Sequence, residues 1–147
     1  MIKKLMKKIY FLFLLIILLA CGEKGSKGMI FDNLLIYVPL PGNSVTAGYT
    51  NIINQSNQNI TITSITSPQF SNVEIHETVI KDGIAKMIEI KQLMIPKNDS
   101  ILLERGGKHL MLFDPILAIK KSQKIELEVL LSSNEKITFS VSATSRF

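Results

Sequence analysis

The chain of 147 residues contains a single cysteine, and this scarcity excludes several kinds of protein. One cysteine cannot form a disulfide framework within the chain, a cysteine-based zinc site or a CxxC redox pair. The length suits one domain, and a domain of this size can bury a hydrophobic core without such cross-links. Any chemistry of the domain must therefore depend on other side chains.

Positive charge and hydrophobicity are concentrated at the start of the chain. Lys3, Lys4, Lys7 and Lys8 precede an unbroken apolar run over residues 9–20. A basic start followed by roughly 7–15 apolar residues is typical of a secretory signal. The run is too short for an ordinary transmembrane helix, which needs about 20 residues.

The apolar run ends in Leu18-Leu19-Ala20-Cys21, which resembles the lipobox of bacterial lipoproteins. In that family the signal peptide is removed before the cysteine, and the cysteine is then acylated. The resemblance implies a signal peptide over residues 1–20 and a lipid anchor on Cys21. It also implies export to a bacterial membrane, facing the periplasm or the cell exterior. The alternative is an ordinary signal peptide that happens to contain a cysteine.

The rest of the chain is close to neutral, with 13 basic and 12 acidic side chains. Its longest basic run is Lys120-Lys121, so it has no patch for nucleic acid, and we expect no nucleic-acid partner. Residues 21–33 are interpreted as the lipidated cysteine and a flexible tether, because residues 22–30 are rich in Gly, Lys and Ser. Residues 34–147 are expected to form one domain.

That domain has the pattern of an all-β protein. Short segments rich in Ile, Val, Thr, Leu and Tyr are separated by turn residues, and they lie at 34–38, 47–53, 60–66, 73–80, 84–90, 100–104, 109–112, 124–131 and 136–143. Many short strands with such turns predict a Greek-key β-sandwich or barrel.

Both histidines and two of the methionines form one pattern, His76, Met87, His109 and Met111. His109 and Met111 are two residues apart, so on a strand their side chains leave the same face. The alternative is that such residues merely fill the core or the surface. Met29 and Met94 are interpreted in that way, Met29 in the tether and Met94 in the core.

Turn residues predict that these four side chains converge. Asp82-Gly83 is a two-residue hairpin signal that places Thr78 opposite Met87, with His76 diagonal to Met87 on the same face. Gly106-Gly107 predicts a second turn that could carry His109 and Met111 beside this hairpin. The four side chains are therefore expected to meet at one edge of the sandwich.

Two imidazoles and two thioethers form a donor set that is neutral when it binds a metal. Thioethers are soft donors, and the sulfur favours Cu(I) over Zn(II) and over hard ions. Without an anionic sulfur, such a set can capture Cu(I) and still release it. This combination suits a carrier better than a catalytic or structural site.

The spacing His-x10-Met-x21-His-x-Met resembles that of the PCuAC copper chaperones. The resemblance extends over about residues 34–143, through blocks at 47–53, 73–87, 93–97, 106–112 and 127–141. It implies a cupredoxin-like Greek-key fold that binds one Cu(I) per chain through His76, Met87, His109 and Met111. It also implies a metallochaperone, not an enzyme, that delivers copper outside the cytoplasm, typically towards the dinuclear copper centre of cytochrome c oxidase.

Other functions fit the sequence less well. A blue-copper protein needs a cysteine thiolate, and the only cysteine is assigned to the anchor. A metallohydrolase needs hard ligands and a bound water, and Glu77, next to His76, should point to the opposite face. A lipoprotein that serves as a metal-free interaction or assembly domain remains the alternative. The expected partners are the membrane and a copper acceptor, such as an oxidase subunit or its assembly factor, and the chain is expected to be a monomer.

Overall fold

The computed structural model describes residues 28–146, which form ten strands in one antiparallel sheet. The proposed signal peptide over 1–20 and Cys21 lie outside the described residues. The strands are β1 (Met29–Ile36), β2 (Val45–Asn54), β3 (Ile60–Thr66), β4 (Phe70–Lys81), β5 (Ile84–Glu89), β6 (Leu93–Ile95), β7 (Asp99–Leu103), β8 (Lys108–Pro115), β9 (Lys124–Leu131) and β10 (Lys136–Ser142). Across residues 28–146, no helix is long and apolar enough to cross a membrane.

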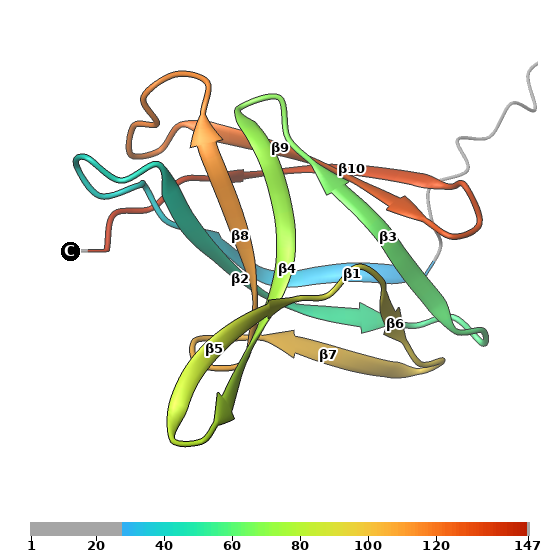
Figure 1. Cartoon of the computed structure of the whole chain (residues 1–147). Coiled ribbons are helices and arrows are strands. Elements are labelled where there is room, and N and C mark those ends of the chain that lie inside the picture. Colours follow the sequence, from blue (N-terminus) through green and yellow to red (C-terminus); the bar gives the residue numbers. More distant parts are fainter. Residues whose placement is uncertain (1–27, 147) are drawn as a thin grey trace, which may run out of the picture.

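The sheet curves on itself until its two ends nearly meet (Figure 1). Its strands follow the order β1-β2-β8-β4-β3-β9-β10, while β5, β6 and β7 pair with β4, β3 and β2 respectively. Thr144 links the ends, because its N–H donates to the Ile36 carbonyl and its own carbonyl accepts from the Val38 N–H, each at 2.9 Å. Phe31 of β1 also stacks on Phe139 of β10, with ring centroids 4.3 Å apart. The all-β expectation is confirmed.

Alternation along each strand decides which side chains enter the core. On β9, Ile125, Leu127 and Val129 are fully buried, and the residues between them face outward. On β8, Leu110 and Leu112 enter the same core. The residues that alternate with them therefore lie on the outer face of the sheet.

The long strand β4 continues past the barrel and turns into β5, and this hairpin projects from the body of the domain (Figure 1). Asp82 and Gly83 form its turn with φ angles of 54° and 75°, as a type I′ turn requires. Thr78 pairs with Met87, which confirms the register expected from the sequence. Within residues 28–146, β5 pairs with β4 alone, and every β5 residue before Glu89 is exposed.

Two expectations about the fold are wrong. Residues 29–33 belong to β1 and not to the tether, and Met29 is buried in the core. The polar Asp32 and Asn33 interrupt the strand pattern there, where the β1–β2 register shifts between Asp32 and Leu35. Met94, expected in the core, is 54% exposed, because the short strand β6 turns its two outer residues inward and its middle residue outward.

Candidate metal centre

The two histidines face each other across neighbouring strands. His76 on β4 pairs directly with His109 on β8, and the centroids of their rings are 6.2 Å apart. Met111 follows His109 by two residues, so it projects from the same face of β8. The predicted placement of the second strand beside the hairpin is therefore correct.

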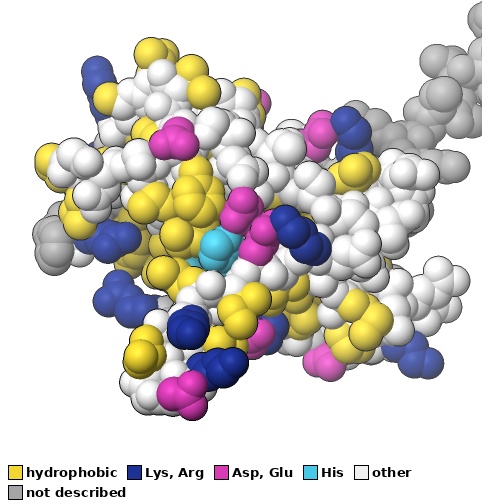
Figure 2. Space-filling model, in the orientation of Figure 1, with side chains coloured by type: hydrophobic (Ala, Val, Ile, Leu, Met, Phe, Trp, Pro, Cys, Tyr) yellow, Lys and Arg dark blue, Asp and Glu magenta, His cyan; other side chains and the backbone are white. Residues whose placement is uncertain are grey.

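Met87, His109 and Met111 line one surface cleft of about 300 Å³, together with Thr78. His76 does not line this cleft, but its ring lies next to that of His109. The structure thus brings three of the four predicted residues into one cleft and sets the fourth beside it. Figure 2 shows a histidine on this face, with hydrophobic side chains on one side and acidic ones on the other.

The turn before β8 fixes the orientation of His109. Gly106 has a φ of +81°, a left-handed conformation that suits glycine. The carbonyl of Gly107 then accepts hydrogen bonds from the Thr78 N–H at 3.2 Å and from His109 Nδ1 at 3.0 Å. Because a carbonyl only accepts, Nδ1 of His109 carries the proton of the neutral imidazole, and Nε2 of that form keeps its lone pair.

His76 is held by a different kind of partner. Its Nε2 lies 2.5 Å from Oε2 of Glu74, and its Nδ1 is buried without a hydrogen-bond partner among residues 28–146. Asn72 donates from Nδ2 to Oε1 of Glu74 at 2.6 Å. The hydrogen bond from His76 holds the pKa of Glu74 below its ordinary value, against an opposing effect of desolvation.

Sequence reasoning alone did not identify Glu74 as the hydrogen-bond partner of His76. The spacing of two residues on a strand, which places His109 and Met111 on one face, also applies to Glu74 and His76. By the same rule Glu77 leaves the opposite face, where Lys108 Nζ donates to its Oε1 at 2.6 Å. The prediction that Glu77 points away from His76 is confirmed.

The cleft offers neutral donors in a weakly positive setting. Arg105 and Arg146 line it, and none of the described residues that line it is acidic. Arg146 lies over the ring of Tyr37, with 5.2 Å between the guanidinium carbon and the ring centroid. Within the described residues, no three His, Cys, Asp or Glu side chains form a cluster that could hold a metal ion. Thioethers are soft donors, and the positive charge of the arginines opposes a divalent cation more strongly than a monovalent one. The donor set therefore suits a soft monovalent cation better than a hard divalent one.

Solved structures share this architecture. The copper-bound PCuAC domain of PmoF2 is similar with a TM-score of 0.68 and 14% identity, over 84% of this chain and 98% of that domain. The Cu(I) form of DR1885 from Deinococcus radiodurans gives a TM-score of 0.67 and 19% identity, over 86% of this chain and 85% of DR1885. At these identities the likeness shows the fold, and it confirms the expected cupredoxin-like Greek-key architecture.

Two curated relatives match shorter segments. An uncharacterized protein of Rickettsia prowazekii is 26% identical over 92 residues, which are 62% of this chain and 51% of the relative. A protein of Leifsonia xyli subsp. xyli, described as a "Putative lipoprotein", is 30% identical over 97 residues, which are 65% of this chain and 58% of the relative. This chain therefore matches little more than half the length of either relative.

A family model described as "Putative lipoprotein LpqE-like" matches residues 29–143. That segment runs from the first residue of β1 to just beyond β10, so it includes the whole sheet and all four residues of the His–Met pattern. By this match the chain belongs to the LpqE-like family.

Proposed function

We propose that this protein is an extracytoplasmic Cu(I) metallochaperone that binds one Cu(I) through His76, Met87, His109 and Met111. The observation that carries the proposal is the strand register. It sets His76 directly opposite His109, while Met87 and Met111 share a cleft with His109. Four residues scattered over 36 positions of sequence thus gather on one face of the sheet.

The state of the donors supports Cu(I) as the cargo. Each imidazole has one nitrogen hydrogen-bonded to an oxygen acceptor, and its other nitrogen has no hydrogen bond to the described part of the chain. The thioethers supply the soft sulfur that favours Cu(I), and no thiolate is needed. The solved neighbours described as copper-bound and as a Cu(I) form have the same fold, which agrees with this assignment.

Release of the metal is proposed to occur by ligand exchange. Met87 is 59% exposed on the projecting hairpin, so an incoming ligand of an acceptor protein can reach its sulfur first. The remaining ligands would then be replaced one at a time. Because all four donors are neutral, no step of this exchange requires an anionic sulfur ligand to be displaced from the copper.

The lipobox indicates where in the cell this copper binding would take place. We propose that Cys21 carries a lipid anchor, in agreement with the family and the Leifsonia relative, which are described as lipoproteins. An anchor would confine the domain near a membrane-bound acceptor and raise their effective concentration. The proposed acceptor is the copper centre of cytochrome c oxidase or an assembly factor for it. Labelling of the full chain with a fatty acid, lost in Cys21→Ser, tests the anchor.

Anaerobic titration of residues 22–147 with Cu(I), against a competing chelator, tests the copper proposal. The expected result is one Cu(I) per chain, with weaker binding after each of His76→Ala, Met87→Ala, His109→Ala and Met111→Ala. Met94→Ala is the matched control, because Met94 is exposed to a similar extent as Met87 but lies on β6. If the parent takes up no stoichiometric copper, the metal-free interaction domain becomes the better description.

A further inference from the structure

We propose that Glu74, itself held by Asn72, positions His76 so that copper binds its Nδ1 and not its Nε2. The inference rests on the proposed function, since it names the binding atom of one ligand and the residues that select it. Glu74 and Asn72 do not touch the metal in this proposal. They act through His76.

The protonation of His76 follows from its partners. Its Nε2 lies 2.5 Å from Oε2 of Glu74, and an ionised carboxylate can only accept a hydrogen bond. Nε2 therefore carries the proton of the neutral imidazole, and Nδ1 carries the lone pair. Nδ1 is buried and has no hydrogen-bond partner in the part of the chain that the structure describes, whereas buried polar atoms nearly always have one. A soft metal ion is a partner that this lone pair could take.

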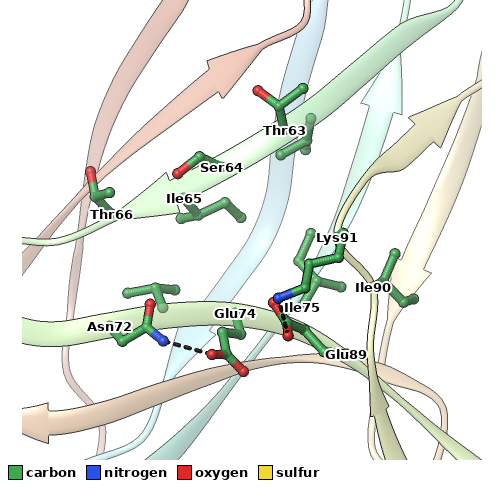
Figure 3. Close-up of a pocket in the computed structure, with 12 residues that line it drawn as sticks. Thr63, Ser64, Ile65, Thr66, Asn72, Glu74, Ile75, Glu89, Ile90 and Lys91 are labelled. Atoms are coloured by element: carbon green, nitrogen blue, oxygen red, sulfur yellow. Dashed lines mark hydrogen bonds and ion pairs between the residues drawn. The ribbon is translucent and has the colours of Figure 1, made fainter.

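The carboxylate of Glu74 is itself held in place. Asn72 donates to Oε1 at 2.6 Å, which leaves Oε2 for His76. Asn72, Glu74 and His76 are each two residues apart on β4, so their side chains share one face of the strand. Figure 3 shows Asn72 and Glu74 side by side in the groove between β3 and β4, joined by this hydrogen bond.

His76 is held through Nε2, whereas His109 is held through Nδ1. Its Nδ1 donates to the carbonyl of Gly107, so its Nε2 is the nitrogen left for a metal. The two histidines would thus bind Cu(I) through different atoms, one selected by a side chain and the other by the backbone. Only the side-chain half of this arrangement can be removed by substitution.

A second carboxylate near His76 provides a matched control. Glu89 pairs with His76 across the β4–β5 ladder, but its carboxylate contacts Lys91 Nζ at 2.5 Å. Glu89→Gln therefore removes the same charge close to His76 without touching the Glu74 hydrogen bond. Partners that orient a metal-bound histidine typically change metal affinity about 10–100-fold when they are mutated.

In Glu74→Gln the new amide has one oxygen and one NH2 group. If Asn72 keeps its hydrogen bond to the oxygen, the NH2 group faces Nε2 of His76 as a donor. The imidazole would then move its proton to Nδ1, the nitrogen that should bind copper. We expect Cu(I) affinity to fall about 10–100-fold in Glu74→Gln and to change less than about threefold in Glu89→Gln.

Nitrogen NMR of the histidine rings shows directly which nitrogen carries the proton and which binds copper. The chain has only two histidines, so 15N-histidine labelling of residues 22–147 gives two ring patterns, which His76→Gln assigns. Without metal, His76 should carry its proton on Nε2, and His109 should carry its proton on Nδ1. Diamagnetic Cu(I) should then shift Nδ1 of His76 and Nε2 of His109. In Glu74→Gln the metal-free His76 should show its proton on Nδ1.

Three results would overturn the inference while leaving the copper proposal intact. Cu(I) could shift Nε2 of His76, both nitrogens of His76 could carry protons at neutral pH, or Glu74→Gln could bind Cu(I) as tightly as the parent. A different result, in which Cu(I) shifts neither histidine, would refute the proposed function itself.

Discussion

His109 is 7% exposed on a strand with neighbours on both sides, whereas Met87 is 59% exposed on a hairpin strand with one neighbour. Within the described residues, β8 lies between β2 and β4, and β5 pairs with β4 alone. The histidine ligands of the proposed site therefore stand on the barrel, and one methionine ligand stands on the arm that projects from it. We call these two parts the barrel half and the arm half of the site.

The two halves of the site differ in how firmly the fold holds them. Backbone pairing on both sides and a buried core beneath hold the barrel half in one geometry. The arm half has exposed Ile80, Ile84 and Ile88 around Met87 and little core of its own. Elements with few buried apolar contacts open at lower free energy than core strands. In the proposed copper carrier, the barrel half would select copper and the arm half would release it.

The largest effect is expected from the core beneath the barrel half. Leu110 lies between His109 and Met111 and is fully buried, so Leu110→Ala should lower the free energy of unfolding by about 2–5 kcal/mol. Leu102→Ala on β7 is the control, because Leu102 is largely exposed and should change stability by less than about 0.5 kcal/mol. Denaturant unfolding measures both. Equal losses in the two variants would show that burial does not distinguish these positions.

A smaller and local effect is expected at the tip of the arm. Gly83 has a φ of +75°, and a Cβ there would have no atom of the described residues within 4 Å, so the cost of Gly83→Ala is backbone strain of about 1–2 kcal/mol. Hydrogen exchange should quicken on β5 and the facing end of β4, while protection on β9 should not change. Faster exchange on β9 as well would mean that arm and barrel open together.

The smallest effect concerns the pH dependence of the barrel half. The pKa of Glu74 lies below its ordinary value of 4.5, chiefly because His76 donates a hydrogen bond to the carboxylate. A lowered pKa in the folded state stabilises the fold above the unfolded pKa, and this contribution is lost as pH falls through the folded pKa. The stability difference between the parent and Glu74→Gln should therefore shrink below about pH 4.5 in the metal-free protein. A difference that stays constant with pH would show that the carboxylate charge contributes nothing.

Local signals in the sequence predicted the parts of the site that depend on local structure. Asp82-Gly83 fixes the hairpin register because both positions adopt positive φ, and residues two apart share a strand face. The pairing of His76 with His109 depends on how distant strands meet in the barrel, and no local pattern encodes that register. The start of β1 was missed for a related reason. Its polar residues are compatible with a tether until β2 provides a pairing partner.

Contacts between side chains were harder to predict than strand faces. The alternation rule places Glu74 beside His76, but it does not say that Glu74 will bond to the ring instead of facing solvent. The orphaned Nδ1 of His76 becomes visible only once the packing around the ring is known. The burial of Met29 and the exposure of Met94 likewise depend on how their strands are covered.

X-ray absorption spectroscopy at the copper edge tests the central claim most directly, because it identifies the atoms bound to the metal. For residues 22–147 loaded with one Cu(I), we expect two nitrogen and two sulfur ligands. We also expect the loss of one sulfur in Met87→Ala and no change in Met94→Ala. A Cu(I) site with only nitrogen and oxygen ligands, or one that keeps both sulfurs in Met87→Ala, would contradict the proposed ligand set.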